Sequence, residues 1–209
     1  MSATPPIAGV ILAGGLSRRM GGDKSLMPLA GRPLIAHAIE RLRPQVDELA
    51  INANDDPARF AAFGLPIVPD TTTGHAGPLA GILAGMQWAS GMHVALLATV
   101  SVDAPFFPQD LVARLSEATD GQAIAVARSA GRVHPVFGLF PVRLAGDLEG
   151  FLRRDERRSV TGWLAGQAMV AVDFEGSSPG SGDPFFNINT PEDLAVAARA
   201  IPAHNLQNR

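Results

Sequence analysis

Short apolar runs recur along the chain, each followed by glycine, proline or polar residues. The first covers residues 7–12, and similar runs lie at 49–53, 65–68, 94–98 and 123–127. Runs of this length between turn-forming residues predict buried strands. The chain therefore begins with a series of strands that we expect to share one sheet.

Between these runs, apolar residues recur at the three- and four-residue spacing of a helix face. One helix is expected to begin at Pro33, because proline is favoured in a first helical turn. Its apolar stripe is Leu34, Ile35, Ala38, Ile39 and Leu42. The next helix begins at Gly77-Pro78 and carries Leu79, Ile82, Leu83 and Met86, and a third covers 108–118. Alternating strands and helices predict a mostly parallel sheet with helices on both faces.

The second half of the chain has a less regular pattern. Thr190 is expected to cap a last helix, with Pro191 at its first position and Asp193 near the capping-box position. No linker divides the chain, so we expect a single domain over residues 1–209. The other expected elements are strands at 133–140 and 168–174, helices at 142–154 and 159–166, a Gly/Ser loop at 175–183 and a frayed tail at 202–209.

The composition limits the classes of function. A net charge of −3 argues against a broad nucleic-acid surface, so positive charge that binds an anion must be local. The chain has no cysteine, which excludes disulfides, thiolate metal sites and cysteine nucleophiles and agrees with a reducing cytoplasm. No segment has the pattern of a secretory signal or the roughly 20 apolar residues of a membrane span. We therefore expect a cytoplasmic protein that binds neither nucleic acid nor membranes.

The loop after the first strand combines glycines with basic side chains. Gly14 and Gly15 follow the strand, and Arg19 and Lys24 come later in the same loop. The spacing differs from that of a P-loop, and adjacent glycines do not fit the G-x-G-x-x-G dinucleotide fingerprint. The glycines alone would also suit a tight turn. With Arg19 and Lys24 they predict a phosphate site, since backbone N–H groups and basic side chains both bind anions.

Two carboxylates, Asp70 and Asp103, follow predicted strands. Ligands of open α/β sheets bind beyond the carboxyl ends of the strands. Asp103 is a candidate ligand for Mg²⁺, which takes one or two carboxylates together with water and phosphate oxygens. The alternative for Asp103 is a turn before Pro105, and a Pro-Asp-Thr turn explains Asp70 equally well.

Amide side chains mark two further places. Asn52 and Asn54 lie at the end of the strand expected at 49–53, and Asn187 and Asn189 precede the last helix. Amides at such positions either form turns or contact a base or ribose. His134 precedes a proline in a strand and either faces the site or is a satisfied core histidine. The basic residues within 153–158 form either a solvated helix end or an anion-binding patch.

Taken together, these motifs resemble those of the molybdenum cofactor guanylyltransferases, the MobA family. The resemblance spans nearly the whole chain in the family's order. The first motif alone marks the wider nucleotidyltransferase superfamily, and the whole set is more specific. The matching motifs are Leu12-Ala-Gly-Gly-Leu-Ser-Arg-Arg-Met-Gly-Gly-Asp-Lys24, Leu29-Ala-Gly-Arg-Pro-Leu34, Ile51-Asn-Ala-Asn54, Pro69-Asp70, Gly77-Pro-Leu-Ala-Gly81, Asp103-Ala-Pro-Phe106, His134-Pro135 and Asn187-Ile-Asn-Thr-Pro-Glu-Asp-Leu194.

The resemblance implies a three-layer, Rossmann-like α/β nucleotidyltransferase fold with a mostly parallel, partly mixed sheet. It implies transfer of GMP from GTP to molybdopterin bearing molybdenum, with release of pyrophosphate and with Mg²⁺ as cofactor. Residues 1–105 would form a nucleotide-binding half and residues 106–201 an acceptor-binding half. Transient contacts with molybdenum-insertion and molybdoenzyme-maturation proteins are implied as well.

The same resemblance assigns roles to individual residues. Asp103 would hold the metal and Lys24 would bind phosphates, and we add the hypothesis that Arg19 and Lys24 together hold the departing pyrophosphate. The acceptor side would include His134, Asn187 and Asn189. The implied nucleotide contacts are Leu12, Ala13, Gly14, Gly15, Lys24, Asn52, Asp70 and Asp103.

The chain departs from the family pattern at Ala104, where many members have a threonine after the aspartate, so a hydroxyl is lost while the carboxylate is kept. A related family that uses CTP tends to have alanine at the position of Gly14. Glycine there leaves room for a purine and favours GTP, although one methyl group discriminates by only about 1–3 kcal/mol. The alternatives are thus a CTP-using cytidylyltransferase, a sugar-phosphate nucleotidyltransferase and a non-catalytic nucleotide-binding protein.

Overall fold

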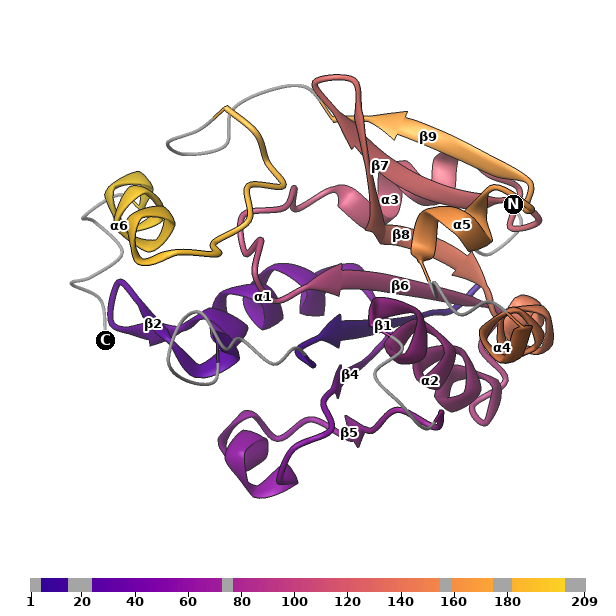
Figure 1. Cartoon of the computed structure of the whole chain (residues 1–209), viewed down its shortest axis with the longest axis horizontal. Helices are drawn as coiled ribbons and strands as arrows, with labels where there is room; N and C mark the ends of the chain where they lie inside the picture. Colours follow the sequence, from indigo (N-terminus) through magenta and orange to yellow (C-terminus); the bar gives the residue numbers. More distant parts are fainter. Residues whose placement is uncertain (1–4, 15–23, 73–76, 155–158, 175–181, 202–209) are drawn as a thin grey trace.

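The computed structural model describes residues 5–14, 24–72, 77–154, 159–174 and 182–201. In these ranges a seven-stranded sheet has the order β5-β4-β1-β6-β8-β7-β9, and a small separate sheet pairs β2 with β3 (Figure 1). The strands are β1 (Ile7–Leu12), β2 (Pro28–Leu29), β3 (Arg32–Pro33), β4 (Glu48–Asn52), β5 (Ile67–Val68), β6 (Leu96–Ser101), β7 (Ile124–Ser129), β8 (Arg132–Pro141) and β9 (Met169–Asp173).

Helices connect most of these strands. None of the helices in the described ranges is long and apolar enough to cross a membrane. The α-helices are α1 (Leu34–Leu42), α2 (Pro78–Ser90), α3 (Leu111–Glu117), α4 (Ala145–Arg154), α5 (Val160–Leu164) and α6 (Pro191–Ala200). The 3₁₀-helices are η1 (Lys24–Leu26), η2 (Arg43–Gln45), η3 (Pro57–Phe63) and η4 (Val142–Leu144).

The large sheet is mostly parallel, as predicted. Within the described ranges β8 is the one reversed strand, because it pairs antiparallel with both β6 and β7, whereas the pairs β1–β4, β1–β6, β4–β5 and β7–β9 are parallel. All strands except β8 therefore point their carboxyl ends toward the same edge of the sheet. Ligand sites of such sheets lie at this edge.

Helices cover both faces of the sheet, which gives the predicted three layers. Side chains of β1 alternate between two cores, as the period of a strand requires. Ile7 and Ile11 pack with α1 and α3, whereas Val10 and Leu12 pack with α2, α4 and α5. Figure 1 shows α6 apart from these layers, next to β2.

Element boundaries differ from the predictions where long-range pairing or a turn decides them. The strand expected at 94–98 is β6, which ends at Ser101 because it pairs with β1 over its whole length. Pro33 pairs in β3 and immediately precedes α1 instead of lying in its first turn. The helix expected at 108–118 begins at Leu111, and the one expected at 142–154 is divided into η4 and α4. The predicted tail and most of the Gly/Ser loop lie outside the described residues.

The capping box of α6 is present as predicted. The Thr190 hydroxyl accepts from the Asp193 N–H at 3.1 Å, and the Asp193 carboxylate accepts from the Thr190 N–H at 2.9 Å. The Asn189 N–H donates to the same carboxylate oxygen at 2.9 Å, and this bond is the largest cause that lowers the pKa of Asp193. These bonds fix the orientation of Asn189 relative to the first turn of α6.

Candidate active site

The candidate site lies at the edge where the carboxyl ends of β1, β4, β5 and β6 meet. Backbone hydrogen bonds continue the sheet a little beyond these ends. The Ala13 N–H donates to the Asn52 carbonyl at 2.9 Å, and the Val102 N–H donates to the Leu12 carbonyl at 3.2 Å. Leu12 is buried, Ala13 is half-buried and Gly14 is exposed. The backbone after β1 therefore reaches the surface between β4 and β6.

Lys24, at the start of η1, is held by two oxygens at this edge. Its Nζ lies 3.0 Å from Asp103 Oδ2 and donates to Asn189 Oδ1 at 2.8 Å. Asp103 Oδ1 accepts from the Ser101 hydroxyl at 2.5 Å. The Lys24 and Asp103 side chains are only 14% and 25% exposed, so water screens this pair less than a surface ion pair. Lys24 is also the only lysine of the chain.

The donor set around Asp103 suits a hard divalent cation. The Asp103 carboxylate and the Asn189 amide oxygen are ligands that Mg²⁺ accepts, and both already converge on one positive group. No three His, Cys, Asp or Glu side chains gather as a metal site in the described ranges. Other coordination positions would go to water and phosphate oxygens, as is usual for Mg²⁺. The residues thus fit a cation that binds together with a phosphorylated substrate.

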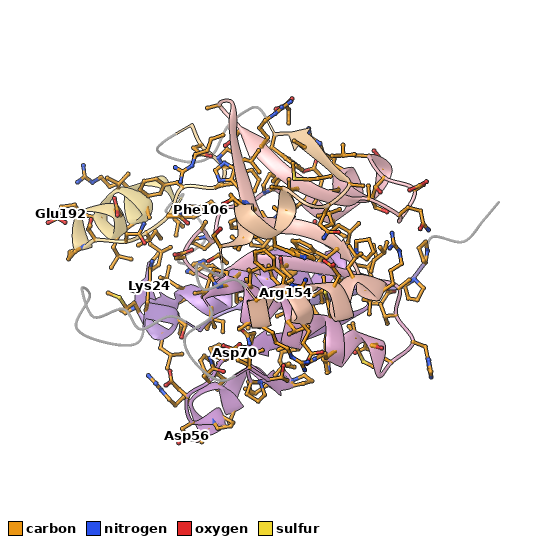
Figure 2. All side chains as sticks on the ribbon, turned by 45° about the vertical axis from the view of Figure 1, so that its right-hand side comes forward. Lys24, Asp56, Asp70, Phe106, Arg154 and Glu192 are labelled. Atoms are coloured by element: carbon orange, nitrogen blue, oxygen red, sulfur yellow. The ribbon has the colours of Figure 1, made fainter. Side chains whose placement is uncertain are left out.

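Two amides hold the Asp70 carboxylate, and Figure 2 shows Asp70 at some distance from Lys24. Asn52 Nδ2 donates to Asp70 Oδ1 at 2.9 Å, and Asn54 Nδ2 donates to Asp70 Oδ2 at 2.8 Å. Asn54 Oδ1 in turn accepts from the Asp70 N–H at 2.8 Å. A Cβ at Gly14 would lie 3.7 Å from both Asn52 Oδ1 and Asn54 Nδ2. Gly14 therefore faces a fixed group of amides and a carboxylate.

Helix α2 packs directly against this group, and Gly81 permits the approach. A Cβ at Gly81 would lie 2.3 Å from Asn52 Oδ1 and 2.8 Å from Leu12 Cδ2. Asn52 cannot easily move away, because its Nδ2 also donates to the Val68 carbonyl at 2.9 Å and its side chain is buried. The close packing of α2 against Asn52 and Leu12 therefore explains why the Gly77-Pro-Leu-Ala-Gly81 motif ends in glycine.

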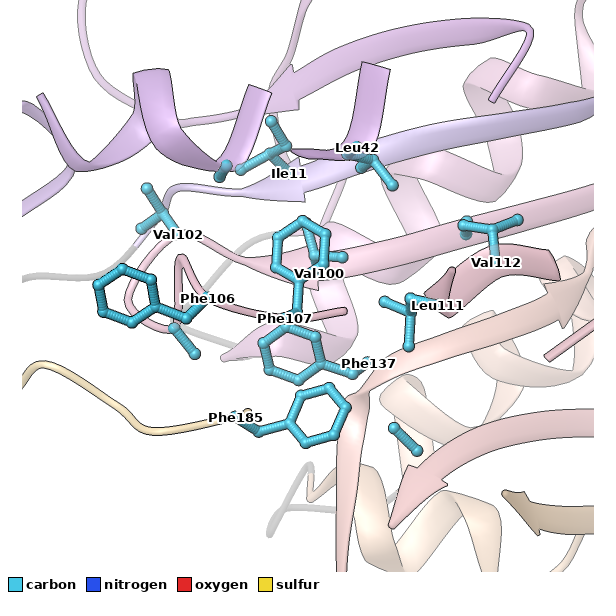
Figure 3. Close-up of a cluster of buried hydrophobic side chains, with 14 of the residues drawn as sticks. Ile11, Leu42, Val100, Val102, Phe106, Phe107, Leu111, Val112, Phe137 and Phe185 are labelled. Carbon is cyan, nitrogen blue, oxygen red and sulfur yellow. The ribbon is translucent and has the colours of Figure 1, made fainter. Parts of the chain in front are cut away.

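His134 is buried beside the phenyl rings of Phe137 and Phe185, which Figure 3 shows close together. Its ring stacks on Phe185 with the centroids 4.5 Å apart, and its Nε2 lies 2.7 Å from Ser129 Oγ. The Ser129 hydroxyl donates to Asp183 Oδ1 at 2.8 Å. Burial lowers the pKa of His134, although the Asp183 charge opposes this effect. His134 thus has the partners of a satisfied core histidine, and its role toward an acceptor stays a prediction.

Residues 183–189, which we call the strap, run from this buried group to Lys24. Phe185 and Ile188 are buried in the main core, and Asn187 is half-buried between them. The Ile188 N–H donates to the Asp103 carbonyl at 2.8 Å. Asn189 then reaches Lys24 at the end of the strap. Asp103 and Asn189, which are far apart in the sequence, thus both contact the ammonium of Lys24.

The predicted site residues therefore fall into three groups. Lys24, Asp103 and Asn189 form one cluster, while Asn52 and Asp70 form a second beside Leu12, Ala13 and Gly14. His134 and Asn187 lie on or beside the strap. Gly15 and Arg19 lie outside the described residues.

Sequence reasoning missed three residues that hold others in place: Ser101, Ser129 and Asp183. A hydroxyl two positions before Asp103 was an available signal for Ser101. The partners Ser129 and Asp183 are 54 positions apart, so no local pattern connects them.

Known proteins similar to this chain match it over most of its length. The model of the family described as MobA-like NTP transferase domain matches residues 9–169. A protein of Bradyrhizobium sp. (strain ORS 278) named molybdenum cofactor guanylyltransferase is 50% identical over 203 residues, which cover 95% of this chain and 94% of that protein.

Solved structures share the fold at lower identity. Molybdopterin-guanine dinucleotide biosynthesis protein A from Archaeoglobus fulgidus has a TM-score of 0.72 at 22% identity, covering 91% of this chain and 96% of that one. A Mycobacterium tuberculosis H37Rv protein described as a complex with manganese has a TM-score of 0.67 at 17% identity, covering 94% of this chain and 100% of that one.

Proposed function

This chain belongs to the MobA-like NTP transferase family, and we propose that it transfers GMP from GTP to molybdenum-bearing molybdopterin with release of pyrophosphate. The observation that carries the proposal is the convergence of Lys24, Asp103 and Asn189 at the carboxyl edge of the sheet. A triphosphate needs positive charge, which the Lys24 ammonium supplies directly and which a divalent cation on the Asp103 carboxylate would supply as well. The name of the Bradyrhizobium relative supports GTP as donor and molybdopterin as acceptor.

The proposed step is an in-line displacement at the α-phosphorus of GTP. A terminal phosphate oxygen of the pterin forms a bond to the α-phosphorus. The bond between the α-phosphorus and the oxygen that bridges the α- and β-phosphates breaks, and pyrophosphate leaves with that electron pair. The attacking phosphate is already anionic and needs no strong general base. The protein's contribution is therefore positioning and charge neutralisation.

In this proposal Lys24 and Arg19 hold the pyrophosphate portion. Asp103 holds Mg²⁺, which supplies positive charge to the phosphate oxygens when bound. The manganese complex of the Mycobacterium tuberculosis neighbour supports a divalent cation as cofactor. The nucleoside is bound by residues 12–15, Asn52 and Asp70, and the acceptor by His134, Asn187 and Asn189.

Gly14 gives a test of the choice between GTP and CTP. Its Cβ position faces Asn52 and Asn54 at 3.7 Å, an ordinary contact, so Gly14→Ala leaves the fold intact but narrows the space beside the amides. We expect the ratio of kcat/KM for GTP over CTP to fall by about 10-fold to 200-fold. Equal use of both nucleotides by the unchanged chain would favour the cytidylyltransferase alternative.

Pyrophosphate release tests the reaction itself. We expect release from GTP only when molybdopterin and a divalent cation are both present. Asp103→Asn should reduce it by about 100-fold or more, because a neutral amide would hold the divalent cation that neutralises the reacting phosphates less well than a carboxylate. Asp110→Asn is the matched control, since Asp110 is an exposed aspartate whose carboxylate lies 3.9 Å from Arg114.

Other outcomes would favour the alternatives. Release that requires a sugar phosphate in place of molybdopterin indicates a sugar-nucleotide enzyme. GTP binding without any release indicates a non-catalytic binding protein. Full turnover by Asp103→Asn would contradict the assigned metal role.

We further propose a single domain whose residues 1–105 bind the nucleotide and whose residues 106–201 bind the acceptor. The protein would act in the cytoplasm and make transient contacts with molybdenum-insertion and molybdoenzyme-maturation proteins. Size-exclusion chromatography of mixtures with such proteins, with and without bound product, tests these contacts.

A further inference from the structure

We propose that Ser129, His134 and Asp183 form a polar anchor that positions the strap, so that Asn189 holds Lys24 in the orientation required for phosphate binding. The three residues are positioning residues, because they act through Asn189 and Lys24. The relevance of the anchor to the nucleotide rests on the proposed function, whereas its effect on Lys24 does not.

The anchor is a buried chain of hydrogen bonds. Ser129 is 4% exposed and His134 is 7% exposed. The Ser129 hydroxyl has one proton, which it donates to Asp183 Oδ1 at 2.8 Å. The bond of 2.7 Å between Ser129 Oγ and His134 Nε2 must then be donated by the imidazole N–H. The chain of bonds therefore fixes the tautomer of His134 as well as the position of Asp183.

The same residues also hold the start of the strap. Asp183 Oδ1 accepts from the Phe185 N–H at 2.9 Å, and the Asp183 carbonyl accepts from the Phe186 N–H at 3.2 Å. The His134 ring stacks on the Phe185 ring. The anchor thus controls both the backbone and one side chain of the strap at its first residues.

At its other end the strap reaches the cluster of Lys24, Asp103 and Asn189. The Ile188 N–H donates to the Asp103 carbonyl at 2.8 Å, and Asn189 Oδ1 accepts from Lys24 Nζ at 2.8 Å. In the described ranges, the Lys24 ammonium donates to Asn189 Oδ1 and Asp103 Oδ2. A shift of the strap therefore changes the direction in which Lys24 points.

Polar contacts are needed here because apolar burial alone does not set the register of the strap. Phe185 and Ile188 are 1% and 0% exposed, but burial of apolar surface is not directional. A slip by one residue moves an extended chain by about 3.3 Å. That displacement is several times larger than the range of normal hydrogen-bond lengths, which run from about 2.7 to about 3.2 Å. The directional bond of Ser129 to Asp183 opposes such a slip at the start of the strap. The bond of the Ile188 N–H to the Asp103 carbonyl opposes it at the end.

The single lysine makes the proposal directly measurable. In protein labelled with ¹³C,¹⁵N-lysine, Lys24 gives the only lysine side-chain signals in the NMR spectrum. We expect Asn189→Ala to shift these signals, and Ser129→Ala and Asp183→Ala to shift them in the same direction. Ser159→Ala is the matched control, because it also removes a serine hydroxyl that accepts a hydrogen bond, from the Gly162 N–H at 3.0 Å, in another part of the fold.

A double-mutant comparison separates positioning from a merely structural role. If the anchor acts through Asn189, Ser129→Ala causes no further shift in an Asn189→Ala background. The proposal is overturned if Ser129→Ala and Asp183→Ala leave the Lys24 signals at the wild-type position, or if the shifts of Ser129→Ala and Asn189→Ala are additive. Asp183 is only partly buried, so Asp183→Ala decides the result if Ser129→Ala does not fold.

Titration with GTP and Mg²⁺ in the same spectra tests the link to the proposed function. We expect Lys24 signals to respond in the wild type, and GTP affinity to fall by about threefold to tenfold in Ser129→Ala and Asn189→Ala, with no further loss in the double variant. If the Lys24 signals do not shift when GTP and Mg²⁺ are added, the proposed function is contradicted. The spectra of the ligand-free variants would still test whether the anchor positions Lys24.

Discussion

Replacing Gly81 by alanine tests whether the approach of α2 to Asn52 organises the nucleotide side of the site. The new Cβ would lie 2.3 Å from Asn52 Oδ1, 2.8 Å from Leu12 Cδ2 and 2.9 Å from Asn52 Cγ. Real Cβ atoms do not occupy such positions, so the Asn52 side chain or the helix must move. Movement of Asn52 breaks its bonds to the Val68 carbonyl and to Asp70.

The expected magnitude follows from three contributions. Overpacking a core costs about 1–3 kcal/mol. Loss of one or two hydrogen bonds of a buried amide costs about 1 kcal/mol each. The higher helix propensity of alanine offsets about 1 kcal/mol of this loss. Gly81→Ala should therefore destabilise the protein by about 1–4 kcal/mol and, because Asp70 loses a partner, weaken GTP binding by about tenfold, which equals about 1.4 kcal/mol.

Urea unfolding and GTP titration measure the two effects. Gly146→Ala in α4 is the control, because a Cβ there meets no atom within 4 Å and only the gain of about 1 kcal/mol in helix propensity remains. A Gly81→Ala variant that is as stable as the wild type and binds GTP equally well would refute the close packing of Asn52 against α2.

Three further predictions concern stability. Asp147→Ala removes the acceptor of the buried Trp163 Nε1–H and should cost about 1–2 kcal/mol in urea unfolding; no change would mean that another group accepts this proton. Arg128→Ala breaks an exposed ion pair with Asp173 and should leave the unfolding midpoint nearly unchanged, at high salt as at low salt. Burial lowers the pKa of His37 from 6.5, so at a pH just below 6.5 the unfolded chain binds a proton at this residue and the folded chain does not. The stability of the fold should therefore decrease as the pH falls through about 6.5. His37→Gln should make the urea-unfolding midpoints at about pH 7.5 and about pH 5.5 more similar, and an unchanged difference between them would contradict this.

Elements with strong local signals were predictable from the sequence. The strand at Ile7–Leu12 agrees with its apolar run, and the capping box of Thr190 and Asp193 agrees with its spacing. The partly mixed sheet implied by the resemblance is confirmed, but the local pattern could not show that β8 is the reversed strand between β6 and β7, because strand pairing depends on contacts between distant residues. The same dependence moved the limits of β6, which are set by its pairing with β1.

The site shows the same division between local and distant information. Asp70 and Asp103 were identified because they follow strands, and their position at the carboxyl edge follows from parallel topology. The contact between Lys24 and Asn189 joins positions 165 residues apart, so no spacing rule could reveal it. Ser129 and Asp183 were missed for this reason as well.

The strand order also has a consequence for how the protein folds. β1 lies between β4 and β6, and Ile7 pairs with Leu96, so the centre of the sheet cannot close until the chain has been made as far as β6. Pairing between such distant segments slows folding, because the entropy of a long loop is lost before the contacts form. During synthesis the first strand therefore remains without one of its neighbours while nearly half of the chain emerges, and the cluster of Lys24, Asp103 and Asn189 is completed only when the residues before α6 arrive.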